Sequence, residues 1–252
     1  DNPDLLPEDL LGHPMTAVLE LRDGHKRHFH GLVTRFGSGA PQGRHFGYRA
    51  SLRPWLWFLT RTSDCRIFQD MTVPDIVKTV FSDHAAIAKF EFKLFRQYRT
   101  RVYCVQYRET DHNFVARLLE EEGIYWYFEH SEQEHKLMLV DDMGAHNPVA
   151  GYETLPYYGN RSQVPPDTEY VSSWSFSREV KAGSVVLRSY DFERPSTSLT
   201  ATNTLAREYA LSEYEQFDYQ PDFLTNDDGL QLAENRVGEQ HSHSERLRRA
   251  TN

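Results

Sequence analysis

Short segments of alternating apolar and polar residues limit the fold of this 252-residue chain more than any other feature. Residues 15–21 and 29–33 alternate in this way, and the Asp23-Gly24 pair between them is a turn signal, which predicts a β-hairpin. The same alternation predicts four further strands, at residues 48–52, 90–94, 103–107 and 124–128. Because successive side chains of a strand point to opposite faces, we expect a fold rich in half-buried β-sheet.

The first predicted helix lies between Val73 and Phe81, where apolar residues recur at helical spacing and form one continuous stripe. Thr72 precedes the stripe and is a good N-cap. Pro74 falls in the first turn, where its missing N–H costs nothing. These signals predict a helix that is buried along one side.

A second helix is expected to begin at Thr110 or Asp111, either of which can cap it, and to end just before Gly123. Its last turn carries the run Glu120-Glu121-Glu122. Consecutive helical residues point about 100° apart, so these carboxylates cannot converge on one substrate atom. We interpret them as a solvated face or a polar contact with a partner, not as catalytic groups.

The second half of the sequence begins with a connector rich in proline and glycine at residues 141–168. Two paired strands are expected next, with Ser172, Trp174 and Phe176 on one face, and Val186, Tyr190 and Phe192 on one face of the return strand. The turn between them is expected at residues 181–183. A long, weakly amphipathic helix is predicted from Asp227 through Leu247.

Histidine offers the best lead for a metal site or an enzyme, since the chain has 12 of them. His28 and His30 share one face of a predicted strand, and His241 and His243 lie close together in the last predicted helix. A zinc site needs a third protein ligand and supporting hydrogen bonds, and the sequence identifies no such partner. Positions two apart on a helix also point away from each other. We therefore predict no metal site.

Other short motifs fail on inspection. Gly37-Ser38-Gly39 lacks the ending that a phosphate-binding loop needs, and residues 226–229 (NDDG) lack the spaced oxygen ligands of a calcium loop. Asp111-His112 resembles two thirds of a catalytic triad, but adjacency in sequence says nothing about geometry, and helix capping explains Asp111. The prediction is that no residue is catalytic, binds a cofactor or binds a metal.

Composition excludes several classes of protein. The formal net charge of −9 disfavours non-specific binding to nucleic acid or anionic lipid. No apolar run approaches the roughly 20 residues that span a bilayer, and none resembles a secretory signal. Cys65 and Cys104 have no metal-binding spacing, and we interpret each as a buried structural thiol in a reducing cytosol.

The two ends predict that the sequence is a piece of a longer protein. It begins at Asp1 with no methionine, almost directly before a strand. Its last residues, 249–252, continue an apparently helical pattern without a glycine or proline stop.

Six segments of the sequence form a recognisable series: FHGLVTRF (29–36), RPWLWFLTRTSDCRIFQDMTVPDIVKTVF (53–81), YCVQYRETDHNFVARLLEEEGIYWYFEH (103–130), VDDMGAH (140–146), WSFSREVKAG (174–183) and YDFERP (190–195). In content and order they resemble the VgrG (valine-glycine-repeat) spike proteins of bacterial type VI secretion, in the region similar to a phage baseplate hub.

The resemblance implies a mainly β, α+β fold of two β-barrel-like tube domains with an α+β domain inserted between them. Residues 1–52 would end the first barrel, 53–150 would form the insert, and 151–252 would supply the connector and the start of the second barrel. The family's oligonucleotide-binding-like neck, β-helical spike and any C-terminal effector are absent from this sequence.

The resemblance also implies partners and a location. In the family, three chains form a ring whose barrels match the hexameric tube of Hcp, with the spike on the other side. The implied partners are a homotrimer of the full-length protein, Hcp, baseplate components, and effector or adaptor proteins, with no nucleic acid, no stable membrane insertion and no cofactor. The particle is assembled in the bacterial cytoplasm and delivered outside the cell or into a target cell.

Two other functions compete with a structural hub. A cell-wall glycosidase would need two carboxyl groups roughly 5 to 9.5 Å apart across a cleft, presumed to lie in the inserted domain. A nucleic-acid-binding regulator would use Arg246, Arg248 and Arg249, but the dipole at a helix end explains these arginines without a ligand.

Overall fold

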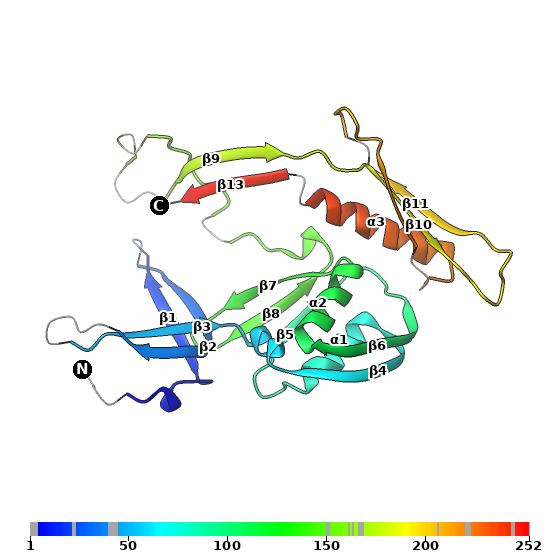
Figure 1. The fold of residues 1–252 in the computed structure, drawn as a ribbon. Coiled ribbons are helices and arrows are strands. Elements are labelled where there is room, and N and C mark those ends of the chain that lie inside the picture. The colour runs from blue at the N-terminus through cyan, green and yellow to red at the C-terminus, as the bar shows by residue number, and fades with distance from the viewer. Residues whose placement is uncertain are drawn as a thin grey trace. The chain divides into compact units, whose positions relative to one another are not determined.

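The computed structural model describes residues 5–21, 24–39, 45–149, 152–160, 162, 164–165, 169–205, 207–219, 223–242 and 245–251. The chain divides into two compact units, one of Asp1–Glu120 with Ile124–Ala145, and one of Glu121–Gly123 with His146–Asn252. The fold is mainly β with α-helices in both units, as expected (Figure 1). No sheet closes into a barrel within the described ranges. The three predicted segments, 1–52, 53–150 and 151–252, stay a prediction.

The first unit opens with a short 3-10 helix (Pro7–Asp9) and a three-stranded antiparallel sheet in the order β1-β2-β3. Its strands are β1 (Pro14–Glu20), β2 (Lys26–Ser38) and β3 (Tyr48–Arg53). Pairing of Ala17 with Phe29 confirms the predicted hairpin, and β3 confirms the strand predicted at 48–52. Asp23 of the predicted turn lies outside the described residues.

The rest of the first unit alternates strands and helices. A 3-10 helix (Trp55–Thr60) leads to β4 (Ser63–Thr72), α1 (Val73–Ser82), β5 (Phe90–Lys93), β6 (Thr100–Thr110), α2 (Asp111–Glu121), β7 (Tyr125–His130), β8 (His135–Val140) and a last 3-10 turn (Met143–Ala145). β4 pairs antiparallel with β6, and β8 lies between parallel β5 and antiparallel β7. The sequence did not predict β4, because only Phe68 of this strand is fully buried.

The ends of both helices follow from their sequences. Thr72 Oγ1 accepts the N–H of Asp75, which confirms the predicted cap of α1. For α2 the cap is Thr110, whose Oγ1 accepts the N–H of Asn113 at 3.2 Å. Gly123 has a φ of +69°, and the N–H of Ile124 donates to the carbonyl of Leu119 at 2.8 Å. This is a Schellman ending, which favours glycine at that position.

The core of the first unit is formed by α1, α2 and the inner faces of the strands. Phe81 and Phe114 are fully buried. Phe81 packs edge-on against Trp55 at a centroid distance of 4.9 Å, and Phe114 stacks on Phe68 at 5.5 Å. The apolar stripe predicted for α1 is therefore the side that faces this core.

The second unit contains two small sheets and one long helix. β9 (Val171–Arg178) pairs antiparallel with β13 (Glu245–Thr251). β10 (Ser184–Ser189) lies between antiparallel β11 (Leu199–Thr204) and parallel β12 (Glu215–Tyr219). α3 (Asn226–Ser242) packs along β10 and β11 (Figure 1), and the core between them includes Leu187, Ala201, Phe223 and Ala233.

The predicted pairing of the strands around residues 181–183 is wrong. β9 pairs with β13 and not with β10, because the partner that completes its backbone hydrogen bonds comes from the end of the chain. The return strand also ends at Ser189, so Tyr190 and Phe192 lie beyond it. Its buried apolar side chains are Val185 and Leu187, not Val186.

The predicted length of the last helix is also wrong. α3 ends at Ser242, and Leu247 lies in β13 opposite Phe176. The helical interpretation of residues 249–252 is therefore also wrong for the described residues 249–251, which belong to β13. The weak amphipathicity of this region did not favour a helix strongly enough to resist pairing with β9.

Gly229 allows α3 to approach the sheet closely. A Cβ at this position would lie 2.6 Å from a ring carbon of Phe223 and 2.9 Å from the Cβ of Ala201. Phe223 is fully buried, so its ring cannot move aside without disturbing the core. The NDDG segment thus serves packing, since its glycine lies where helix and sheet meet.

We predict that Gly229→Ala lowers the free energy of unfolding by about 1–3 kcal/mol, because the added methyl group overpacks this contact. Gly238→Ala is a matched control in the same helix, since a Cβ there meets no atom within 4 Å. The control should be neutral or raise the stability by up to about 1 kcal/mol, as alanine favours helix. Urea unfolding of both variants measures the difference, and equal stabilities would contradict this account.

Candidate functional site

The structure brings His30 together with a histidine that the sequence did not single out. The Nδ1 atoms of His30 on β2 and His135 on β8 lie 2.7 Å apart. His135 Nε2 also accepts the backbone N–H of Trp55 at 2.7 Å. A third ring, that of His130, lies 6.0 Å from His135 between centroids. This histidine junction connects β2, β8 and the start of the 3-10 helix that follows β3.

The hydrogen bonds of the junction assign the protons. Because His135 Nε2 accepts a hydrogen bond from the backbone N–H of Trp55, the ring proton of neutral His135 must be on Nδ1. That N–H donates to Nδ1 of His30, whose proton is then on Nε2. Burial, together with the neighbouring histidines His30 and His130, lowers the pKa of His135 to about 4. Burial also lowers the pKa of His30, so both rings are neutral at pH 7.

The other candidate histidines do not join this junction. His28 lies two positions from His30 on β2, His241 is buried in α3, and His243 lies outside the described residues. Within the described ranges, no group of three or more histidine, cysteine, aspartate or glutamate residues could hold a metal ion. The hydrogen bonds of His30 and His135 instead connect β2 and β8 to the backbone of Trp55.

Asp111 is the centre of a buried polar network and does not cap α2, which corrects the sequence interpretation. Its carboxylate accepts hydrogen bonds from Thr62 Oγ1 at 2.7 Å, Gln106 Nε2 at 2.7 Å and Arg66 Nη2 at 3.0 Å. His84 Nε2 lies 3.4 Å from the same group, so the histidine beside Asp111 is His84 and not His112. The four partners come from separate parts of the first unit.

The electrostatics of this network favour the charged carboxylate. Burial raises the pKa of Asp111, but the hydrogen bonds from Gln106, Thr62 and His84 and the charge of Arg66 outweigh it, and the net pKa is lowered. Both carboxylate oxygens are occupied by these partners. Asp111 is therefore held as a structural anion with no oxygen left to act as a base.

The three glutamates at the end of α2 point into different surroundings. Glu120 is exposed, Glu121 is half-buried and Glu122 is only 2% exposed. The solvated-face interpretation is therefore wrong for Glu122. The divergence that helical geometry predicts is present, since three adjacent side chains have three different environments.

The remaining motif residues have local explanations. Cys104 is buried as predicted, but Cys65 is exposed, because it lies on the outer face of β4, and its Sγ accepts the N–H of Arg108. The three arginines considered for nucleic acid, Arg246, Arg248 and Arg249, belong to β13, so the helix-dipole explanation for them is wrong.

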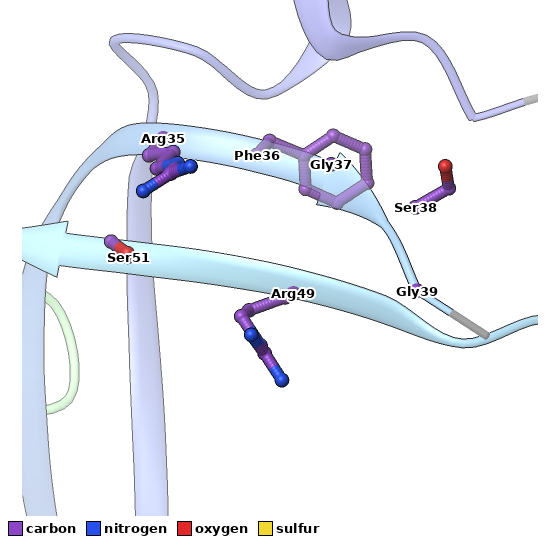
Figure 2. A pocket seen from close by; sticks show the side chains of 7 residues that line it. All are labelled: Arg35, Phe36, Gly37, Ser38, Gly39, Arg49 and Ser51. Atoms are coloured by element: carbon purple, nitrogen blue, oxygen red, sulfur yellow. The ribbon is translucent and has the colours of Figure 1, made fainter.

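Gly37-Ser38-Gly39 lines an open hollow of about 470 Å³ between the ends of β2 and β3 (Figure 2). The other residues that line it are Arg35, Phe36, Arg49 and Ser51. The hollow is formed by a strand pair and not by a loop before a helix. This geometry differs from that of a nucleotide phosphate loop.

Both units also expose large apolar side chains on two-stranded sheets. Ile67, Tyr103 and Tyr107 on the β4–β6 pair are each more than half exposed, as are Trp174 and Phe176 on β9. A two-stranded sheet leaves backbone edges available for pairing, and clustered apolar side chains mark contact surfaces. These strands, not a catalytic cleft, are the candidate functional surfaces of the described residues.

Comparison with known proteins identifies the fold family. A family model of the phage tail baseplate hub (GPD) matches residues 1–252. The chain belongs to this baseplate hub family. The 252-residue chain, called the hub chain from here on, is also similar to the type VI secretion system spike protein VgrG1b of Pseudomonas aeruginosa. The two are 45% identical over 253 residues, which cover 98% of the hub chain.

Solved structures support the same relationship. The c3393 protein of E. coli, a type VI secretion component with structural similarity to the T4 bacteriophage tail proteins gp27 and gp5, matches 71% of the hub chain and 46% of its own with a TM-score of 0.57 and 27% identity. A tail protein from Neisseria meningitidis matches 95% of the hub chain and 67% of its own with a TM-score of 0.63, but at 14% identity it shows the fold alone. The predicted resemblance to the hub-like region of VgrG is confirmed.

The hub chain spans about a third of the length of the curated relatives it matches, 33% of VgrG1b and 38% of VgrG1a. The matches therefore concern the hub portion of those spike proteins. No helix of the described residues is both long enough and apolar enough to cross a membrane.

The histidine junction predicts a loss of stability in mild acid. A histidine whose pKa is lowered in the folded state stabilises the fold above its unfolded pKa of 6.5, and this contribution is lost as the pH falls toward about 4. The loss should reach up to about 3 kcal/mol, since each pKa unit is worth about 1.4 kcal/mol. Urea unfolding at several pH values between 7 and 4 measures it.

A matched pair of variants separates this junction from other titrating groups. His135→Gln should make the free energy of unfolding less dependent on pH between 6.5 and 4, because the imidazole that takes up the proton is gone. His13→Gln, which changes an exposed histidine, should keep the wild-type dependence. An unaltered dependence in His135→Gln would show that the junction does not titrate in this range.

Proposed function

We propose that the hub chain is the structural hub of a type VI secretion spike, and that the full-length protein is a trimer. In this proposal it adapts the hexameric Hcp tube to the puncturing spike. The proposal rests on the match of the baseplate hub family model to residues 1–252, together with 45% identity to a spike protein over 98% of the chain. Baseplate components and effector or adaptor proteins would be its other partners, with assembly in the cytoplasm and delivery outside the cell.

The exposed strands support an assembly role. β9 carries Trp174 and Phe176 on its exposed surface, and beyond its pairing with β13 the described residues add only a bridge from Tyr157 to Val171 at its start. A closed ring of identical chains covers exposed sheet edges by symmetry. The full-length protein would then bury the surface that a single hub chain exposes.

The oligomeric state of a full-length protein containing this hub tests the proposal. Light scattering coupled to size exclusion should give three times the mass of one chain. The 252-residue hub chain, which covers 33% of the length of VgrG1b, is measured for comparison. A stable monomer or dimer of the full-length protein would contradict the hub assignment.

The carboxyl groups of the described residues differ from the acid that a glycosidase uses. Every carboxyl group with a shifted pKa has a lowered one, because hydrogen-bond donors and cations stabilise the charged form even where burial opposes it: Asp75, Glu91, Asp111, Asp141 and Asp191. A glycosidase needs one carboxylic acid with a raised pKa to protonate the leaving group. We infer that the hub chain is not a glycosidase.

Incubation of the purified hub chain with bacterial peptidoglycan tests this inference. We expect no release of soluble glycan fragments above a buffer blank, with a muramidase as positive control. Glu120→Gln is the discriminating variant, because it neutralises the exposed carboxylate of α2 and leaves the buried network of Asp111 intact. Release by the wild type that this variant abolishes would restore the glycosidase function.

A further inference from the structure

Basic residues are segregated in one part of this acidic chain. Residues 24–63 contain seven of the 28 lysine and arginine residues and none of the 37 aspartate and glutamate residues. The seven are Lys26, Arg27, Arg35, Arg44, Arg49, Arg53 and Arg61. This stretch forms β2 and β3, so one hairpin is positive in a chain of net charge −9.

Arg35 and Arg49 are the two members of this set that line the hollow between β2 and β3. Arg35 pairs with Ser51 and Gly37 pairs with Arg49, so the two arginines are diagonal neighbours on one face of the strand pair. Diagonal positions lie roughly 7–8 Å apart, within reach of side chains of this length. Figure 2 shows the two side chains, one from each strand.

Neither guanidinium has a counter-ion among the described residues. Other arginines of the first unit do: Arg66 binds Asp83 and Asp111, and Arg117 binds Glu109. Arg35 and Arg49 are both exposed and form no hydrogen bond or ion pair with any residue that the structure describes. The sequence of the adjoining segment 40–44, APQGR, contains no acidic residue that could neutralise them. Two like charges therefore face the same hollow.

The floor of the hollow leaves room for a ligand group. Gly37 has no side chain, and a Cβ there would meet no atom within 4 Å. Ser51, directly opposite Arg35 in the strand register, adds a hydroxyl donor on the same face as the two guanidinium groups. A planar guanidinium matches the two oxygens of a carboxylate, and charge-assisted hydrogen bonds of this type are roughly twice as strong as neutral ones.

We propose that the hollow between Arg35 and Arg49 is a docking site for an acidic segment of a partner protein, which places an aspartate or glutamate side chain between the two guanidinium groups. Charge complementarity favours this occupant, because a short acidic segment meets only the positive hairpin. A long polyanion such as nucleic acid would also meet the acidic remainder of the chain. The proposal does not depend on the hub assignment.

Fluorescence anisotropy with a labelled octaglutamate peptide tests the site on the 252-residue chain. Octaglutamate should bind, octaglutamine should not, and binding should weaken as salt is raised. R35Q/R49Q should weaken binding by about tenfold or more, since both charge-assisted contacts are lost. R35K/R49K keeps the charges but loses the planar fork, so its affinity should fall between the two.

R178Q/R188Q is the matched control, because it removes the same charge from two exposed arginines of the second unit. It should bind octaglutamate within about twofold of the wild type, and circular dichroism should show all variants folded. Equal weakening in R35Q/R49Q and R178Q/R188Q would overturn the proposal, since net charge alone would then explain binding. Tighter binding of single-stranded oligothymidine than of octaglutamate, lost in R35Q/R49Q, would overturn it in favour of nucleic acid.

Discussion

The buried carboxylate of Asp111 fixes the arrangement of the first unit. Its partners reach it from the segment after the 3-10 helix (Thr62), from β4 (Arg66), from β6 (Gln106) and from the turn after α1 (His84). A buried charge is tolerated only where several donors satisfy it, so these segments must remain together for the fold to persist. The aromatic contacts of Phe81 and Phe114 then fill the space that this network defines.

Local signals were sufficient to predict much of the first unit. The Thr72 cap, the apolar stripe of α1 and the glycine ending of α2 depend on residues a few positions apart, and each lies as predicted. The β1–β2 hairpin belongs to the same group, because its turn and its alternation are adjacent in sequence. Where structure is decided by neighbours along the chain, the sequence pattern was reliable.

Features decided by distant residues were not predictable from such patterns. His30 meets His135, which is 105 positions away, and Asp111 meets Arg66, which is 45 positions away. No spacing rule connects residues that far apart. The predicted pairing of β9 failed for the same reason, since its partner β13 comes from the end of the chain. The unpaired arginines of the hairpin needed the strand register before they could be recognised as neighbours.

The pairing of β9 with β13 also has a consequence for biosynthesis. Arg178 of β9 pairs with Glu245, so 67 residues must be translated after Arg178 before β13 begins. At roughly 5–20 residues per second, β9 emerges from the ribosome several seconds before β13. During that interval Trp174 and Phe176 belong to an unpaired, aromatic strand, which is the kind of nascent segment that chaperones bind and that associates with neighbouring chains. The residues that stay exposed in the folded hub are thus also the residues most vulnerable while it is being made.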